Sequence, residues 1–313
     1  MKPRYTAYLY LLLVSLMWGA AGPIIKFTEQ EFPPFIFLLY RFFISALLAL
    51  AILSRQKSAS RQINRHFGSL FLCSFFAFTL SLGLLFLGFA KTSALMGQLL
   101  SATGPILTAV AGAIFLKERV IGQEKIGITI AFAGTIFTAI QPILNGNGKA
   151  LVSIEGNLLI VGSVLASIIA TIITKQLLRA KLSPLFIANV TFILAFFTMI
   201  PVTLTFHRTS EIWEVITTAS LASHLGVWYM AVLSGTMAYA LYNLAMKSIE
   251  IGEASIFAYL YPLWAVPLAV WWLGETVTPQ FLLGAFIIAI GVTIAEYRRR
   301  QAKSRKTHRH RRA

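Results

Sequence analysis

The chain has 313 residues, of which 57% are hydrophobic and only 12% are charged, and its mean hydropathy is +0.75. A chain with so little polar surface cannot form a water-soluble globule of this size, so the composition indicates an integral membrane protein. The formal net charge is +16, and the single cysteine excludes a disulfide framework or a cysteine-based metal site.

Ten apolar stretches are each long enough to cross a bilayer as a helix, which takes about 20 residues. In chain order we expect spans at residues 5–25, 33–53, 69–90, 93–116, 122–141, 156–177, 184–206, 224–246, 252–273 and 279–297. These stretches are continuous and do not alternate between apolar and polar residues, which favours helices over the strands of a barrel.

The positive charges are unevenly distributed between the loops. With the N-terminus placed inside, most of the 27 Lys and Arg residues fall on the inner side, and this asymmetry predicts cytoplasmic termini in a cell (inner) membrane. We expect the basic tail, residues 298–313, to rest against anionic lipid, and its position argues against a nucleic-acid partner. A cleaved signal peptide is disfavoured, because cleavage would delete the first span of the repeat described next.

An internal repeat organises the sequence. Four pairs of identical residues are each separated by 157 positions: Pro105 and Pro262, Glu118 and Glu275, Gly127 and Gly284, and Gly134 and Gly291. A weaker match, at a separation of 149 positions, relates Lys26 to Lys175 at the end of the first span of each half.

The repeat predicts how the chain is divided. Residues 1–145 form a first unit, 146–155 a connecting loop, 156–297 a second unit and 298–313 the tail. Each unit holds five spans, an odd number, so the second unit must enter the membrane from the opposite face. The predicted fold is therefore an all-α polytopic membrane protein with ten transmembrane helices as two inverted five-helix repeats. Such repeats can open a central site alternately to either side, so the architecture indicates transport.

Four stretches of the sequence also resemble a known family. They are "LMWGAAGPIIK", "YRFFISALLAL", "FAKTSALMGQLLSATGPILTAVAGAIFLKERV" and "GTMAYALYNLAMKSIEIGEASIFAYLYPLWAVPLAVWWLGETV". They are similar to the drug/metabolite transporter superfamily, and most of all to its EamA-like ten-span exporters. The resemblance implies that spans one to four and six to nine surround a central cavity, with the fifth and tenth spans packed outside. It also implies a substrate among amino acids, other metabolites and drugs.

Two glutamates and four prolines mark the ends and interiors of the spans. Glu118 and Glu275 each follow a span, where a carboxylate can cap the following helix, and we favour this structural role over gating or substrate contact. Prolines inside spans free the carbonyl four residues earlier, which marks helix breaks that could serve gating or simple kinks. The candidates are Pro23, Pro105, Pro262 and Pro267.

Polar and aromatic residues deep within spans are the candidates for contact with a small-molecule substrate. Helical spacing places Gln98 and Ser101 on one face of the fourth span, and Tyr239 and Asn243 on one face of the eighth. With the deeper aromatic residues and one buried charge, the predicted cavity residues are Trp18, Arg41, Gln98, Ser101, Tyr239, Asn243, Tyr259 and Trp264.

Three further polar features allow two interpretations each. Arg41 lies about two turns into the second span, where it could hold a substrate carboxylate or cap the carbonyls of a neighbouring helix end. Lys26 lies nearer the outer interface, where it could extend toward the interface or serve a function, and the first interpretation is favoured. The hydroxyl stripe of the sixth span is more typical of a helix-packing seam than of ligand contacts; its residues are Ser163, Ser167, Thr171 and Thr174.

The residues that are missing narrow the function further. The chain has no aspartate, and its glutamates lie in loops or close to span ends. This pattern favours facilitated movement over coupling through a buried acid, and it predicts no catalytic residues, no metal site and no cofactor. We expect a transporter of a small metabolite, with an amino acid or related compound and export favoured. The alternatives are a membrane-embedded enzyme and a channel without carrier activity.

Overall fold

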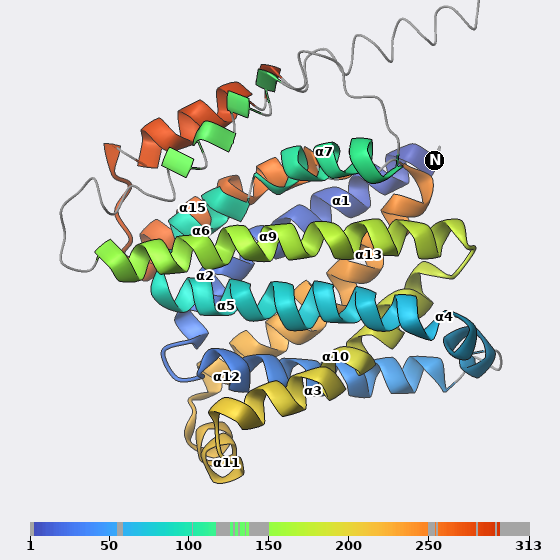
Figure 1. The fold of residues 1–313 in the computed structure, drawn as a ribbon. Coiled ribbons are helices and arrows are strands. Elements are labelled where there is room, and N and C mark those ends of the chain that lie inside the picture. Colours follow the sequence, from blue (N-terminus) through green and yellow to red (C-terminus); the bar gives the residue numbers. More distant parts are fainter. Residues whose placement is uncertain are drawn as a thin grey trace, which may run out of the picture.

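The computed structural model describes residues 3–54, 59–101, 103–116, 126–127, 129–130, 132–134, 136–137, 150–249, 254, 256–279, 281–291 and 293–294. Within these residues the secondary structure is helical, and the long helices run side by side in one bundle (Figure 1). The expected loop at 146–155 lies partly, and the basic tail at 298–313 wholly, outside the described residues.

The first half of the chain forms helices, several of which are interrupted. Helix α1 (Pro3–Gly19) continues after one residue as α2 (Ala21–Thr28), and α3 (Pro34–Leu53) returns through the bundle. Helix α4 (Ala59–Ser74) passes through a π-helical segment, η1 (Phe75–Leu80), into α5 (Ser81–Lys91). Helices α6 (Ala94–Ser101) and α7 (Gly104–Leu116) complete this series.

The second half repeats several of these features. Helix α9 (Ala150–Arg179) and helix α10 (Pro184–Phe206) are long, and α11 (Thr209–Thr218) is a short helix without buried residues. Helix α12 (Leu221–Trp228) passes through a second π-helical segment, η2 (Tyr229–Met237), into α13 (Ala238–Ser248). A 3₁₀ segment, η3 (Ile256–Leu260), leads into α15 (Tyr261–Leu273).

The apolar helices match the expected spans closely. Seven described helical stretches are long and apolar enough to cross a membrane: Arg4–Thr28, Pro34–Leu53, Gln62–Lys91, Ala94–Gly112, Ile154–Arg179, Pro184–Phe206 and Leu221–Ser248. They correspond to expected spans one to four and six to eight. Two shorter apolar helices, Phe257–Leu273 and Phe281–Gly291, lie within the ninth and tenth expected spans. The fifth, 122–141, lies largely outside the described residues, so the all-α polytopic fold is confirmed and the number of ten stays a prediction.

Several helices of the first half pack along a helix of the second half. Helix α3 packs along α10, α5 along α9, and α1 along α13 (Figure 1). Phenylalanines fill the space between several of these helices, with Phe42 and Phe86 fully buried and Phe78 packed 4.7 Å from Phe192, centroid to centroid. Many large apolar side chains point outward instead, such as Leu9 and Leu16 on α1. An outer surface of this kind fits lipid chains and not water.

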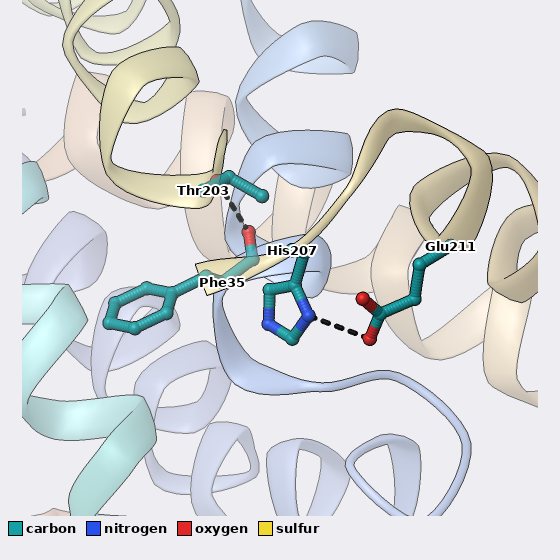
Figure 2. A network of polar contacts seen from close by, with 4 residues as sticks. All are labelled: Phe35, Thr203, His207 and Glu211. Atoms are coloured by element: carbon teal, nitrogen blue, oxygen red, sulfur yellow. Dashed lines mark hydrogen bonds and ion pairs between the residues drawn. The ribbon is translucent and has the colours of Figure 1, made fainter. Parts of the chain in front are cut away.

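The bundle has two distinct ends. The N-terminus lies at one end, and α11 lies at the other (Figure 1). At the α11 end, the Thr203 hydroxyl donates to the Phe35 carbonyl over 3.2 Å and ties α10 to the start of α3 (Figure 2). One turn later His207 Nδ1 lies 2.8 Å from the Glu211 carboxylate, which links the end of α10 to α11 (Figure 2).

Glu275 caps a helix, but not the one that follows it. Its carboxylate accepts hydrogen bonds from the backbone N–H groups of Ala94 and Leu95, over 2.7 and 2.9 Å, at the start of α6. The Ser93 hydroxyl accepts from the next N–H, so the free donors of the first turn of α6 are satisfied. The following helix is capped by Thr278. The expectation for Glu275 was therefore wrong in its partner, and Glu118 lies outside the described residues.

We predict that Glu275→Ala destabilises the protein by about 1–2 kcal/mol, because it leaves two helix N–H groups without their acceptor. Glu275→Gln keeps one acceptor oxygen, so its loss is expected to be smaller. Thermal unfolding of the purified variants in detergent measures both. Equal stability of Glu275→Ala and the wild type would contradict the capping role.

Candidate functional site

A cavity of about 250 Å³ lies within the bundle, between helices of both halves. Most of the described helices contribute to its walls: α1 to α7, α9, α10, α13, the start of α15, and the segments η1, η2 and η3. Predicted site residues in this lining are Trp18, Arg41, Gln98, Ser101, Tyr239 and Asn243. Residues from distant parts of the sequence thus meet around one space that is large enough for a small metabolite.

Gln98 lies at the break between α1 and α2. Its side-chain amide donates to the carbonyls of Trp18 and Gly19, each over 3.3 Å. The Gly19 carbonyl is the one that Pro23 leaves without an N–H partner, as the sequence predicts. Gly22 makes this approach possible, since a Cβ there would lie 2.5 Å from Gln98 Nε2. One amide side chain therefore supplies hydrogen bonds to carbonyls at the interruption of a helix, and it also borders the cavity.

Two π-helical segments border the cavity at corresponding positions of the two halves. Segment η1 covers Phe75–Leu80, and a shift by 157 residues places it within η2, Tyr229–Met237. Wider turns of this kind are rare and occur often at functional sites. In η2, the Ala231 carbonyl accepts from the Ser45 hydroxyl over 3.1 Å, and the Ser234 carbonyl accepts from the Trp18 indole over 2.9 Å.

An aromatic cluster forms one wall of the cavity. The ring of Trp18 lies 5.0 Å from that of Tyr239, 5.3 Å from Tyr242 and 6.2 Å from Tyr261, centroid to centroid. Tyr239 also meets Phe78 edge to face at 5.0 Å. Such contacts hold the rings in fixed orientations. They give the cavity a rigid, partly apolar face.

Arg41 is the most unusual residue of the lining. Its side chain is 1% exposed, and neither Nε nor Nη1 has a hydrogen-bond partner. The guanidinium carbon lies 5.7 Å from the ring centre of Phe42 and 5.9 Å from that of Phe86. Contacts with ring faces compensate only part of the cost of a buried charge. The described lining contains no glutamate, so Arg41 offers unused donors to an anion.

The end of the cavity away from α11 is lined by small polar groups. Asn243 Nδ2 lies 3.5 Å from the Pro184 carbonyl, at the limit of a hydrogen bond. Cys73 borders the cavity at the same end, with its Sγ 3.2 Å from the Thr174 hydroxyl. The amide of Asn243 therefore retains capacity for a ligand.

Two predicted cavity residues and one predicted helix break differ from expectation. Trp264 packs its Cβ against Gly19 and donates its indole N–H to the Ser15 hydroxyl over 3.2 Å. Tyr259 lies in η3, and neither residue belongs to the cavity lining. Helix α15 continues through Pro267 without interruption.

The remaining prolines lie in the first turns of helices. Pro23, Pro105 and Pro262 are near the starts of α2, α7 and α15, where a missing N–H is tolerated. Helices α2 and α7 follow a short break in their spans, and α15 directly follows the 3₁₀ segment η3. A role of these prolines in gating stays a proposal.

Some lining residues were not assigned to the cavity from the sequence. Tyr242 and Tyr261 join the aromatic wall, and the hydroxyl stripe of α9 faces the cavity and not only a packing seam. The stripe comprises Ser163, Ser167, Thr171 and Thr174. Its regular helical spacing was the available signal, but spacing alone does not tell whether a polar face meets a neighbouring helix or a cavity.

The apolar bundle around a central polar and aromatic cavity defines a multi-pass membrane protein of the transporter class. The sequence model of the EamA-like transporter family matches residues 5–140 and again residues 154–296. The chain belongs to the EamA-like transporter family, which confirms the resemblance seen in the sequence. The family points to a transporter and not to an enzyme.

Individual relatives are distant but cover nearly the whole chain. The uncharacterized transporter YyaM of Bacillus subtilis is 24% identical over 296 residues, which are 92% of either chain. A probable amino-acid metabolite efflux pump of Salmonella typhimurium is 24% identical over 90% of this chain and 92% of its own. A crystal structure at 15% identity covers 96% of this chain and 99% of its own with a TM-score of 0.68, which supports the fold alone.

Two glutamates at the α11 end have opposite electrostatic environments. Burial raises the pKa of the Glu29 carboxyl well above its usual range, and the nearby Lys26 ammonium opposes this shift. Neither carboxylate oxygen of Glu29 has a hydrogen-bond partner. The exposed Glu31 carboxylate instead accepts from the Ser220 N–H over 2.6 Å, which lowers the pKa of Glu31.

We predict that Glu29→Gln stabilises the protein more at about pH 8 than at about pH 5. A folded-state pKa above the unfolded one means that the wild type loses stability as pH rises between the two values, and glutamine removes this loss. Glu31→Gln is the matched control, and its effect on stability has the opposite dependence on pH. The Glu31 carboxylate stabilises the folded state at neutral pH and not in acid, so its replacement should destabilise the protein only at the higher pH. Thermal midpoints between about pH 5 and pH 8 measure the effect of Glu29→Gln, and midpoints extended below about pH 5 measure that of Glu31→Gln. A pH-independent effect of Glu29→Gln would contradict the prediction.

Proposed function

We propose that this transporter exports an amino acid or a related small carboxylate across the cell (inner) membrane by alternating access around its central cavity. The observation that carries the proposal is Arg41, a buried cation with unused donors beside a cavity whose described lining has no glutamate. A carboxylate would supply the missing counter-charge and accept hydrogen bonds from the guanidinium. The name of the Salmonella relative points to the same substrate class.

Other cavity residues fit the rest of such a substrate. Gln98 and Asn243 offer amide groups, and Ser101 offers a hydroxyl beside Gln98. Trp18 and Tyr239 form a flat wall for an apolar side chain. The broken helices at Pro23, Pro105 and Pro262 supply points at which spans could bend during opening.

The proposed topology is two inverted five-helix repeats, residues 1–145 and 156–297. The predicted connection between them is 146–155, of which the residues from Ala150 onward are already helical in α9. Both termini lie in the cytoplasm, and the basic tail at 298–313 rests near anionic lipid. The paired sequence positions and the matching π-helical segments support the repeat, and the uneven distribution of Lys and Arg supports the cytoplasmic termini. Without a glutamate in the described lining, movement down the substrate's own gradient is favoured.

The test uses vesicles that contain the purified protein and are loaded with a mixture of amino acids and other small metabolites. Mass spectrometry follows what leaves, with protein-free vesicles as the control. Selective loss of carboxylate-bearing compounds is the expected result. No loss of any compound from vesicles with folded protein would argue against the proposed substrate class.

We predict that Arg41→Met raises the KM for the exported carboxylate by about tenfold to a hundredfold, because hydrogen bonds to a charged group are worth about 1.5–3 kcal/mol. Arg41→Lys keeps the charge but not the fork of donors, so it should be intermediate. Arg179→Met, an exposed arginine at the end of α9, is the control and should match the wild type. An unchanged KM in Arg41→Met would remove Arg41 from the binding site.

The aromatic wall gives an independent prediction. Tyr239→Ala should reduce flux severalfold, because it removes the ring that contacts Trp18 and Phe78. Tyr239→Phe keeps the ring and should retain most of the flux. The same vesicle assay measures both variants, and comparable loss in both would show that the hydroxyl matters more than the ring.

A further inference from the structure

Lys26 joins two helices at the α11 end of the bundle. Its Nζ, on α2, donates to the Phe89 carbonyl over 2.6 Å, near the C-terminal end of α5. The last carbonyls of a helix lack partners within the helix and carry partial negative charge, so an ammonium group binds them favourably. The bond connects the end of the first span to the end of the third.

Lys175 makes the corresponding bond at the opposite end. Its Nζ, on α9, donates to the Met246 carbonyl over 2.9 Å and to the Ile249 carbonyl over 3.0 Å. Both carbonyls lie at the C-terminal end of α13. The N-terminal part of α1 packs against the same segment, which places this bond at the end of the bundle where the chain begins.

The two bonds correspond to each other through the sequence repeat. Phe89 and Met246 are 157 positions apart, the separation that also relates Pro105 to Pro262. The two lysines are the pair that ends the first span of each half. The same contact is therefore made twice, once in each half, and at opposite ends of the bundle.

Both bonds also lie at the cavity. Phe89 and Met246 contribute to its lining, as do Ile25 beside Lys26 and Thr174 beside Lys175. A separation of the paired helices at either end would break the local lysine bond and expose the cavity there. A lysine at a helix end can simply stabilise the fold by a permanent contact. Here, however, the two lysines are related by the repeat and lie at the two ends of one cavity, as expected for contacts that break when that end opens.

We propose that Lys26 and Lys175 are the gating residues of this transporter, each closing one end of the cavity by binding the C-terminal carbonyls of the third helix of its own half. The inference rests on the proposed alternating access and adds the residues that control it. Transport requires that one bond opens while the other holds. Removal of one lysine then shifts the protein toward the conformation that is open at that end.

Cys73 is a natural reporter for this shift. It is the single cysteine of the chain, it lines the cavity, and its Sγ lies 3.2 Å from the hydroxyl of Thr174, next to Lys175. It is 3% exposed while both lysine bonds are present. Opening at the Lys175 end should therefore expose its thiol, whereas opening at the Lys26 end should not.

The experiment measures how fast a water-soluble maleimide alkylates Cys73 in the purified full-length protein, without any substrate. We expect Lys175→Met to raise the rate about fivefold or more, and Lys26→Met to leave it unchanged or lower it. Lys175→Arg keeps donors to the two carbonyls and should restore a rate near that of the wild type. Lys247→Met removes a neighbouring exposed charge on α13 and is the matched control, and Cys73→Ala gives the background.

Equal alkylation rates for Lys26→Met and Lys175→Met would overturn the proposal. Loss of a contact that only stabilises the fold would not favour opening at one particular end of the cavity. An unchanged rate in Lys175→Met would overturn it as well. If Lys175→Met fails to fold, the Lys175→Gln variant takes its place in the same assay. Because the thiol assay needs no substrate, its failure is distinct from a failure of the vesicle assay that tests the proposed function.

Discussion

The structure depends on one constraint: in a bilayer, each backbone N–H and C=O group must find its partner within the protein. A continuous helix meets this constraint by itself, but a transporter needs helices that are interrupted near its cavity. Side chains from distant segments supply the missing partners here. Gln98 binds the carbonyls at the break between α1 and α2, and Glu275 binds the free N–H groups of α6.

These polar bonds also explain how the bundle is held together. Lipid chains are as apolar as the buried phenylalanines, so burial alone does not drive the helices together once they are in the membrane. Close packing and hydrogen bonds between helices must contribute more. The contacts of Trp18 with Ser234 and of Ser45 with Ala231 fasten helices of the first half to η2 of the second.

The sequence alone predicts the spans well, because twenty apolar residues in a row have few alternatives to a membrane helix. It also predicts Gln98, Tyr239 and Asn243 as cavity residues, since buried polar groups at helical spacing share a face. It fails where the answer depends on how helices are rotated or on partners far away in the chain. The stripe of α9 could face a helix or a cavity, and Trp264 could not be distinguished from Trp18 by depth. The partner of Glu275 lies about 180 positions earlier, beyond any local pattern.

The two π-helical segments have a mechanical consequence. A π turn closes its hydrogen bond one residue later than an α turn, so it stores one extra residue within a helix. If η2 were to convert into regular α-helix, the part that follows would turn by about 100° about its axis, the rotation of one residue. Tyr239 and Asn243 would then point away from their present neighbours. Rearrangement of hydrogen bonds within one helix could thus reshape the cavity wall while the part that follows η2 moves along its axis by only about 1.5 Å, the rise of one residue.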